Sequence, residues 1–333
     1  MPAGPWVLVV GCHRSGTSAV TGALALMGLH GVDPSDRMDD TSSNPEHWES
    51  LTGSLLDEDL LASVGGAWDA PPPDDAGTPF PDPLGSRTDP AAILAAAFPE
   101  PGPLVWKDPR NCLLLPYWRD MLPGPLTAVF LWREPMAVAR SLQKRDGIPL
   151  AHGLALWERY NRTAAIGLQG VDTYVLDYAS VITDPVDTLG RLASWLRSLP
   201  RFDAWSATWD VDRGIASIDA GLRHERSEPD DRSAGVPTEH EGMRAWLATI
   251  AGGHEPFAAE PPPAVSVWPE AVLAGRREMA RLRSQLDGFQ DRIRRMEAEL
   301  EGVRTHRDRL LESTSWKVTA PLRTVLAKFG RLD

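Results

Sequence analysis

Near the start of the chain stands the segment Gly11-Cys12-His13-Arg14-Ser15-Gly16-Thr17-Ser18. An apolar run, Trp6 to Val10, precedes it, and an Ala/Leu-rich stretch, Ala19 to Met27, follows it. This order predicts a strand, a phosphate-binding loop and a helix, with the loop amides and the helix N-terminus facing an anion. The segment therefore indicates an oxyanion site at the front of an α/β domain.

The two glycines of this loop have the Gly-x-x-x-x-Gly spacing of nucleotide P-loops. Thr17, however, stands where a kinase or an ATPase carries lysine, and Arg14 is the one arginine or lysine within the loop. The pattern thus predicts an anion site without pointing to ATP. A strand-to-helix turn that binds no ligand is the alternative that these eight residues leave open.

The composition is that of a folded protein with reduced thiols. At 333 residues the chain can hold one α/β domain of roughly 200 to 250 residues and a smaller part. Cys12 and Cys112 show no paired spacing, which indicates a cytoplasmic location. No zinc-ligand pattern occurs, and no window approaches the roughly 20 apolar residues of a membrane span. We therefore expect no metal and no integral membrane segment.

The net charge of -12 is unevenly distributed along the chain. Residues 270–333 hold 14 Lys/Arg against 10 Asp/Glu, so the remaining residues carry the whole negative excess. Binding of nucleic acid needs clustered basic residues that neutralise phosphates. The acidic body therefore argues against nucleic acid as a partner.

Strand-like and helix-like segments alternate through the first 200 residues or so. With helices between them, we expect strands at Trp6–Val10, Leu104–Trp106, Thr127–Trp132 and Thr173–Leu176. Such alternation predicts a P-loop-like three-layer α/β domain with a central parallel sheet, which binds ligands beyond the carboxyl ends of its strands. We assign this domain to residues 1–222, and a charged, Pro-rich loop and linker to residues 223–269, where a strand at Val265–Trp268 is left open.

A heptad pattern sets residues 270–312 apart from the rest of the chain. Apolar residues recur there at spacings of three, four or seven, at Val272, Met279, Leu282, Leu286, Phe289, Ile293, Met296, Leu300, Val303 and Leu310. Arg, Glu and Asp fill most other positions, as in a coiled coil of about five heptads. We expect this coiled coil to join a homo-oligomer or to bind a partner protein. A helix folded back on its own domain is the alternative.

A basic amphipathic tail is expected at residues 313–333, where Trp316, Val325 and Phe329 stand among lysines and arginines. Such a tail can make peripheral contact with an anionic membrane surface, here the inner membrane face, or it can serve as a docking peptide. The sequence leaves both open.

A second motif follows the strand expected at Thr127–Trp132. It reads Arg133-Glu134-Pro135-Met136-Ala137-Val138-Ala139-Arg140-Ser141. An arginine leaves the strand end, a proline suits the first turn of a helix, and a serine comes eight residues after the arginine. An arginine fork beside a serine hydroxyl can hold a phosphate monoester.

Taken together, the first loop (residues 11–18) and the second motif (residues 133–141) resemble the sulfotransferases that use 3'-phosphoadenosine 5'-phosphosulfate (PAPS). The likeness spans roughly residues 5–200. It implies that the 3'-phosphate is bound by Arg133 and Ser141. It also implies that the 5'-phosphosulfate is bound by Arg14, Ser15, Gly16, Thr17 and Ser18.

The resemblance extends to groups that would take part in the reaction. Lys107, in Lys107-Asp108-Pro109-Arg110, matches a Lys-Asp-Pro element of Golgi-type and bacterial members, whose lysine supports the departing bridge oxygen. Lys107 and Arg14 would then neutralise charge on the leaving group, with no metal required. Asp108 and Arg110 are expected to form a structural ion pair beside Lys107.

A base for the acceptor hydroxyl is expected in Asn44-Pro45-Glu46-His47-Trp48-Glu49. This segment resembles the element in which carbohydrate sulfotransferases carry a catalytic glutamate. We favour Glu49 as the group that takes the proton, with His47 and Glu46 behind it. The alternative is a solvated loop that runs into a helix, with Glu49 in its first turn.

The chain departs from the cytosolic eukaryotic sulfotransferases in two ways. Arg14 replaces the lysine of their first loop, as in bacterial members, and their glycine-rich C-terminal cofactor motif is missing from this sequence. How the site closes over the adenine and the 3'-phosphate is therefore open. His224, Arg226 and Arg232 are candidates for the closing loop, and a merely solvated basic cluster is the alternative.

The resemblance implies transfer of a sulfuryl group from PAPS to a hydroxyl of a saccharide, a glycolipid or another lipid-linked acceptor, or a small alcohol. The saccharide is favoured because residues 315–323, Ser-Trp-Lys-Val-Thr-Ala-Pro-Leu-Arg, resemble a tail of bacterial polysaccharide-biosynthesis and glycosyltransferase proteins. Two alternatives remain. One is a P-loop small-molecule kinase that uses ATP and magnesium, and the other is a non-catalytic coiled-coil scaffold with a degenerate nucleotide domain.

Overall fold

A computed structural model gives the fold of residues 4–38, 48–73, 90–122, 124, 126–221, 237–264 and 267–329. The chain divides into two compact units, residues 1–277 and residues 278–333. The first unit contains the sheet and the residues of both predicted anion-binding motifs.

A five-stranded sheet forms the centre of the first unit, in the order β2-β1-β3-β4-β5. Four strands are parallel, namely β1 (Trp6–Val10), β2 (Leu104–Lys107), β3 (Leu126–Trp132) and β4 (Asp172–Asp177). Their near-continuous apolar sequences are typical of strands that are buried on both faces. The predicted α/β fold class with a central parallel sheet is confirmed.

The fifth strand, β5 (Gly252–His254), runs antiparallel to β4 at the edge of the sheet. The sequence did not indicate this strand, because Gly-Gly-His has none of the β-branched or aromatic residues that mark strands.

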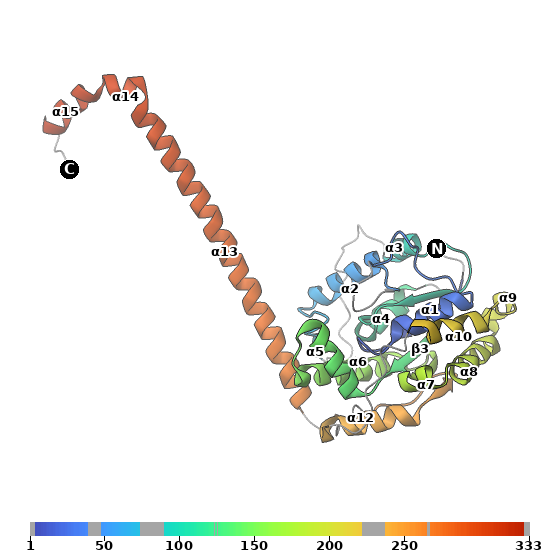
Figure 1. The fold of residues 1–333 in the computed structure, drawn as a ribbon. Helices are drawn as coiled ribbons and strands as arrows, with labels where there is room; N and C mark the ends of the chain where they lie inside the picture. The colour runs from blue at the N-terminus through green and yellow to red at the C-terminus, as the bar shows by residue number, and fades with distance from the viewer. Residues whose placement is uncertain are drawn as a thin grey trace. The chain divides into compact units, whose positions relative to one another are not determined.

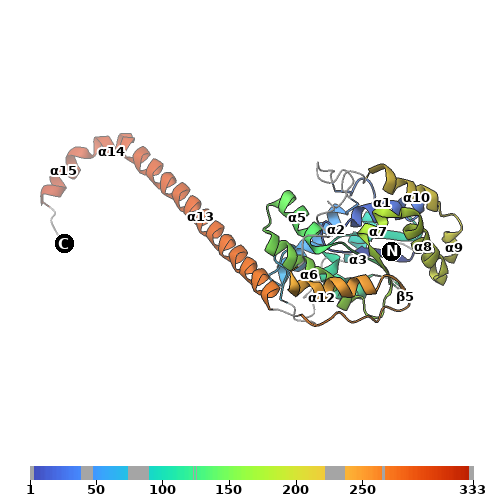
Figure 2. The same ribbon diagram turned by 60° about the horizontal axis from the view of Figure 1, so that its bottom comes forward.

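Helices cover both faces of the sheet (Figures 1 and 2). Alternate side chains of each strand point to opposite faces, so Leu8 and Phe130 pack on one side and Val9 and Leu131 on the other. The first core includes residues of α2 (Leu51–Ser63), α3 (Pro90–Ala97), α4 (Asn111–Met121), α5 (Pro135–Asp146), α6 (Leu150–Gly167) and α12 (Thr238–Thr249). The second core includes residues of α1 (Thr17–Met27), α7 (Tyr178–Thr183), α8 (Pro185–Ser198), η2 (Pro200–Phe202) and α10 (Val211–Gly221), and α9 (Asp203–Ser206) follows η2.

Residues 237–264 differ from the loop and linker that the sequence led us to expect. Helix α12 packs into the first core through Met243 and Leu247, and its buried His240 lies 2.6 Å from Glu158 of α6. The sequence did not indicate this helix, because its apolar stripe is short and charged residues flank it. The strand left open at Val265–Trp268 does not extend to Trp268, where α13 begins, and residues 265–266 lie outside the described ranges.

The long C-terminal helix, α13 (Trp268–Glu312), begins in the first unit and continues through most of the second. Its first turns bind the α/β domain, where Glu270 pairs with Arg159 and Arg276 donates to Asp69 over 2.8 Å. The second unit continues with α14 (Thr314–Val318) and α15 (Ala320–Phe329).

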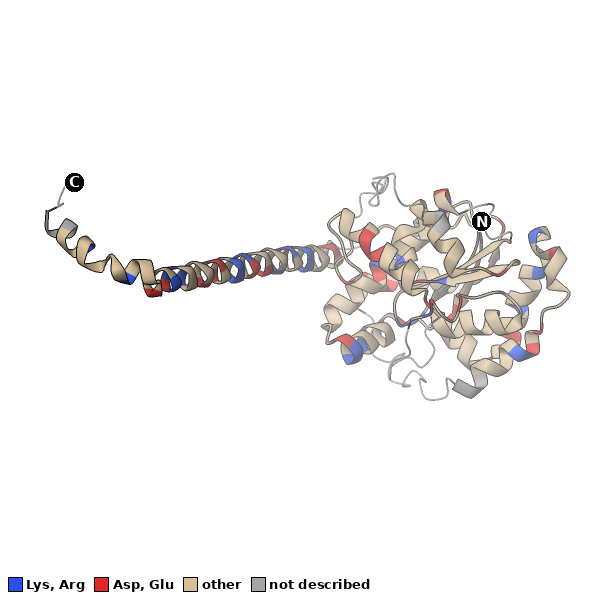
Figure 3. Ribbon diagram, turned by 90° about the horizontal axis from the view of Figure 1, so that it is seen from above, with Lys and Arg blue, Asp and Glu red and all other residues tan. Residues whose placement is uncertain are grey.

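Bands of opposite charge alternate along α13 (Figure 3). Among the helices that the structure describes, none has both the length and the apolar character that crossing a membrane requires.

Candidate functional site

The backbone of the first loop turns sharply from β1 into α1. Gly16, immediately before α1, has a φ of 89°, and Arg14 has a φ of 67° in the left-handed region that non-glycine residues rarely adopt. A Cβ at Gly16 would lie only 2.2 Å from the ring of Tyr178, so glycine is required there for both conformation and space. The turn leads directly into a helix N-terminus, where free amides and the helix dipole favour an anion.

Polar groups at this helix start fit an anionic ligand. The Ser15 hydroxyl is fully buried and has no hydrogen-bond partner within the described ranges. A buried hydroxyl without a partner costs free energy that a ligand or a water can offset. Thr17 and Ser18 form the first turn of α1, which contains no acidic residue.

The first loop and the second motif are in direct contact. Arg14 Nε donates to Ser141 Oγ on α5 over 2.8 Å, and an Arg133 guanidinium nitrogen donates to the Arg14 backbone oxygen over 3.1 Å. Arg133 is buried just beyond β3, and its guanidinium lies 4.7 Å from the centre of the Tyr178 ring. The structure thus brings together three predicted site residues that come from two distant parts of the sequence.

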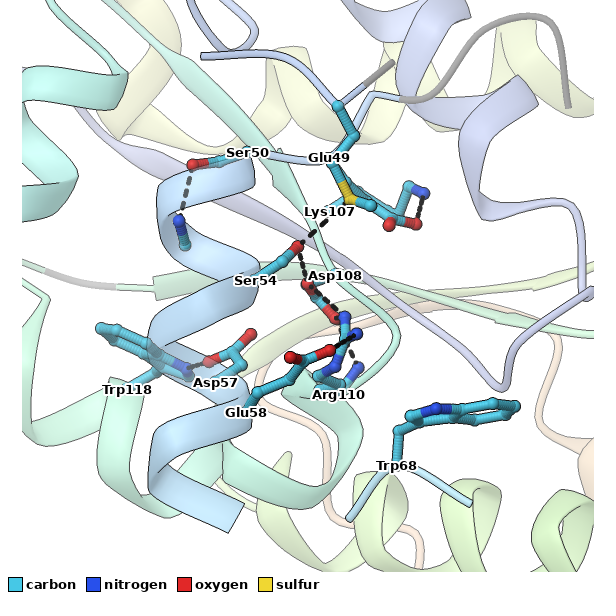
Figure 4. Close-up of polar contacts among 12 residues, drawn as sticks. Glu49, Ser50, Ser54, Asp57, Glu58, Trp68, Lys107, Asp108, Arg110 and Trp118 are labelled. Atoms are coloured by element: carbon cyan, nitrogen blue, oxygen red, sulfur yellow. Dashed lines mark hydrogen bonds and ion pairs between the residues drawn. The ribbon is translucent and has the colours of Figure 1, made fainter. Parts of the chain in front are cut away.

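Two more residues that the sequence singled out, Lys107 and Glu49, lie next to each other at the end of β2 (Figure 4). The Lys107 ammonium, only 1% exposed, forms an ion pair with the Glu49 carboxylate. Glu49 precedes Ser50, the N-cap of α2, and so lies outside the first turn of that helix. Its backbone oxygen accepts from the Met38 amide over 3.0 Å, which fixes the strand-like segment that carries it.

The predicted base and the predicted leaving-group cation are therefore neighbours. The other two candidates for the base, His47 and Glu46, lie outside the described residues.

The expected ion pair beside Lys107 is present. One Arg110 guanidinium nitrogen donates to both carboxylate oxygens of Asp108, each over 3.1 Å. Ser54 and Glu58, on α2, point toward this pair and bind Asp108 and Arg110 over 2.6 and 2.7 Å (Figure 4). These bonds tie α2 to the chain that leaves β2.

The imidazole of His13, in the first loop, is buried and lies near four cationic side chains. Its ring is buried between Trp68 and Tyr160, at 4.7 and 5.3 Å between ring centres. Burial first, and then four nearby cations, lower the pKa of His13 well below its usual value, so the ring is neutral at neutral pH. The four cations are Arg110, Arg145, Lys107 and Arg14. Three of these cations also have a carboxylate partner, namely Lys107 with Glu49, Arg110 with Asp108 and Arg145 with Asp146, so the positive charge around His13 is partly balanced.

The sequence interpretation missed Arg145 and Tyr178, although both carried a signal. Arg145 comes four residues after Ser141 on α5 and therefore lies on the same helix face. Tyr178 immediately follows β4, just as Arg133 follows β3. The proposed closing-loop residues, His224, Arg226 and Arg232, lie outside the described part of the chain.

Asp57, on α2, gives the protein a pH dependence that can be measured. Its carboxyl is buried and accepts a bond from Trp118 Nε1 over 2.9 Å. Burial, and next the charge of Asp108, raise the pKa of Asp57 well above its usual value. The folded protein therefore keeps a proton that the unfolded chain has already lost. As a result, the free energy of unfolding falls as the pH rises from the pKa of Asp57 in the unfolded chain to its pKa in the folded protein. The fall is up to about 1.4 kcal/mol per pH unit.

We expect Asp57→Asn to remove this contribution while keeping an oxygen for Trp118. Urea unfolding between pH 5 and pH 8 should show the variant gaining stability relative to the wild type as the pH rises. Asp59→Asn, which removes the same charge from an exposed position of α2, is the control and should not change the slope. A gap between Asp57→Asn and the wild type that stays constant with pH would contradict the expectation.

No family model and no curated protein matches the chain. Among solved structures, it is similar to the sulfotransferase domain from the Synechococcus PCC 7002 olefin synthase, with 16% identity, a TM-score of 0.38, and 82% of this chain and 94% of that chain covered. It is also similar to the sulfotransferase domain from the curacin biosynthetic pathway, with 12% identity, a TM-score of 0.37, and 83% of this chain and 98% of that chain covered. A third similar structure is the sulfotransferase STF1 from Mycobacterium tuberculosis H37Rv, with 16% identity, a TM-score of 0.36, and 67% of this chain and 78% of that chain covered. All three TM-scores are below 0.5.

Proposed function

We propose that this protein is a sulfotransferase that moves a sulfuryl group from PAPS to a hydroxyl of a saccharide, a glycolipid or a related acceptor. The observation that carries the proposal is the direct contact between the two anion-binding motifs, in which Arg14 binds Ser141 and Arg133 binds the backbone of Arg14. Each motif brings its own anion-binding groups to this contact, which suits a ligand with two anionic groups.

The residues present fit the two ends of such a donor. The first loop offers amides at the start of α1 and the buried Ser15 hydroxyl for the 5'-phosphosulfate. Arg133 and Ser141 offer a guanidinium fork and a hydroxyl for the 3'-phosphate. Thr17 in place of the P-loop lysine speaks against ATP.

The donor supplies the sulfuryl group and, as its bond to sulfur breaks, leaves as adenosine 3',5'-bisphosphate. In the proposed reaction the acceptor oxygen forms a bond to sulfur, and its proton passes to the Glu49 carboxylate. Lys107 and Arg14 balance the negative charge that develops on the departing oxygen. Because Lys107 pairs with Glu49, protonation of Glu49 frees the ammonium charge of Lys107 for that oxygen.

The acceptor and the location are part of the same proposal. The likeness of residues 315–323 to polysaccharide-biosynthesis tails supports a saccharide acceptor. Cys12 and Cys112 are buried free thiols whose pKa values burial raises, which suits a reducing cytoplasm. The basic tail is then placed to contact the inner membrane face, where lipid-linked saccharides are accessible.

Calorimetry of the full chain tests the donor. We expect adenosine 3',5'-bisphosphate to bind and ATP with magnesium not to bind. Binding of ATP with magnesium alone would replace the proposal with a kinase, and binding of neither would favour the non-catalytic scaffold.

A second assay tests the acceptor, with labelled sulfuryl donor and panels of glycans, lipids and small alcohols. Label on a saccharide or a saccharide-bearing lipid is the expected result. Label only on other alcohols would overturn the saccharide assignment while leaving the donor intact.

A further inference from the structure

Residues 278–311 of α13 present an apolar seam that nothing else in the described part of the second unit covers. Its members are each between 48% and 66% exposed, namely Met279, Leu282, Leu286, Phe289, Ile293, Met296, Leu300, Val303 and Leu310. A contiguous apolar face of this length marks an interaction surface. The charges beside the seam identify what covers it.

The spacing assigns each residue of the seam a heptad position. The a positions are Met279, Leu286, Ile293, Leu300 and Arg307, and the d positions are Leu282, Phe289, Met296, Val303 and Leu310. The pattern continues without a stutter over more than four heptads, as in a left-handed coiled coil. Arg307 breaks the apolar run at one a position, and a single polar residue there selects register and strand number at a cost in stability.

The flanking g and e positions show which strand orientation fits. In a parallel, in-register pair, each g residue faces the e residue five positions later in the other strand. The facing pairs are Glu278 with Arg283, Gln285 with Gln290, Arg292 with Glu297, Glu299 with Arg304, and His306 with Leu311. Three of the five pairs join opposite charges, and neither of the other two joins like charges.

An antiparallel pair is a poorer match. If the same heptads overlap fully, e residues face e residues and g residues face g residues. Arg283 then lies opposite Arg304 at two places, and Arg292 lies opposite Glu299 at two places, so repulsive and attractive pairs are equal in number. Like charges at such positions are a common device against the wrong pairing. The parallel arrangement, which has three attractive pairs on each side of the seam and no repulsive pair, is therefore the better match to the charges at g and e.

We infer that residues 278–311 form a parallel, in-register, two-stranded coiled coil between two copies of this chain. This inference does not depend on the sulfotransferase proposal. The ion pairs within one helix, such as Glu278 with Arg281 at 2.6 Å, are exposed and weak enough to be exchanged for those between strands.

Sedimentation of the full-length chain tests the association. The wild type should sediment as a dimer, and Phe289→Glu, which places a charge at a d position, should be monomeric. Ala298→Glu adds the same charge at an f position on the opposite side of the helix and should remain dimeric. Circular dichroism shows whether each variant keeps its helices. A monomeric wild type, a larger oligomer, or equal behaviour of the two variants would overturn the inference.

A charge swap tests the pairing of the strands. Glu299→Arg places arginine opposite Arg304 on both sides of the seam and should raise the dimer dissociation constant by about tenfold. Adding Arg304→Glu restores opposite charges and should restore most of the affinity. If the dimer of the double variant has a dissociation constant no lower than that of the single variant, the g-to-e contact is contradicted.

Disulfide trapping tests the orientation. Leu282→Cys, near the start of the seam, should form a disulfide with its own copy under mild oxidation, because a parallel dimer brings the two positions together. Full antiparallel overlap would place Leu282 opposite Arg307 of the other copy, so disulfides between unlike variants in a mixture with Arg307→Cys would show an antiparallel pair and would overturn the inference. The native thiols of Cys12 and Cys112 are buried in the first unit and do not compete.

Discussion

Arg133→Ala is expected to weaken binding of adenosine 3',5'-bisphosphate by at least about 100-fold, a loss typical of a charged hydrogen-bond partner. The buried guanidinium stacks on Tyr178 and donates to the backbone of Arg14, so its position is fixed before a ligand arrives. Removing it takes away the proposed partner of the 3'-phosphate and one of the bonds that tie the first loop to the second motif. Calorimetry with the wild type and the variant measures the loss.

A second ligand separates phosphate recognition from general damage to the site. Adenosine 5'-phosphosulfate lacks the 3'-phosphate, so the variant should bind it nearly as well as the wild type does. Arg191→Ala, at an exposed position on α8, is the control and should bind both ligands normally. Equal losses for the two ligands would show that Arg133 supports the fold of the loop and does not bind the 3'-phosphate.

The fold could be predicted where local pattern and long-range packing agree. Short apolar runs such as Trp6–Val10 and Thr127–Trp132 are typical of buried strands. Glycines or prolines shortly after them mark where the strands end. The prediction failed where short elements depend on their neighbours. Gly252–His254 becomes a strand because it lies against β4, and α12 is stabilised by packing on α6.

The site could be predicted at the ends of strands, since parallel strands bring those positions to one edge of the sheet. Lys107 and Arg133 were found in this way, and Tyr178 obeys the same rule. Contacts between particular side chains could not be predicted, because they depend on loop paths. Glu49 reaches Lys107 only because the segment before α2 is bonded to the chain near Asp36 and Met38.

The second large effect concerns the pair of Lys107 and Glu49, once sulfuryl transfer has been detected. We expect Lys107→Ala to lower kcat by about 10² to 10³-fold, since a preorganised charge beside a leaving oxygen commonly contributes that much. Glu49→Gln should lower kcat by about 10² to 10⁴-fold, the range for loss of a general base. Neither change touches the groups proposed for the 3'-phosphate, so the affinity for the bisphosphate should change less than kcat in both.

The pH profile and the double variant distinguish chemistry from structure. If Glu49 takes the proton, the acidic limb of the kcat profile should disappear in Glu49→Gln. In Glu49→Ala, which leaves room for a small carboxylate, added acetate should restore part of the rate. Because protonation of Glu49 frees Lys107, the two residues act as a unit, and the double variant should be only slightly slower than the worse single variant.

Glu58→Gln, which removes an exposed carboxylate that binds Arg110, is the matched control and should keep kcat within about threefold. Loss of stability in place of loss of rate would assign Lys107 and Glu49 to the fold. If the losses of kcat in the two single variants multiply in the double variant, Glu49 accepts the proton and Lys107 stabilises the leaving oxygen independently of each other.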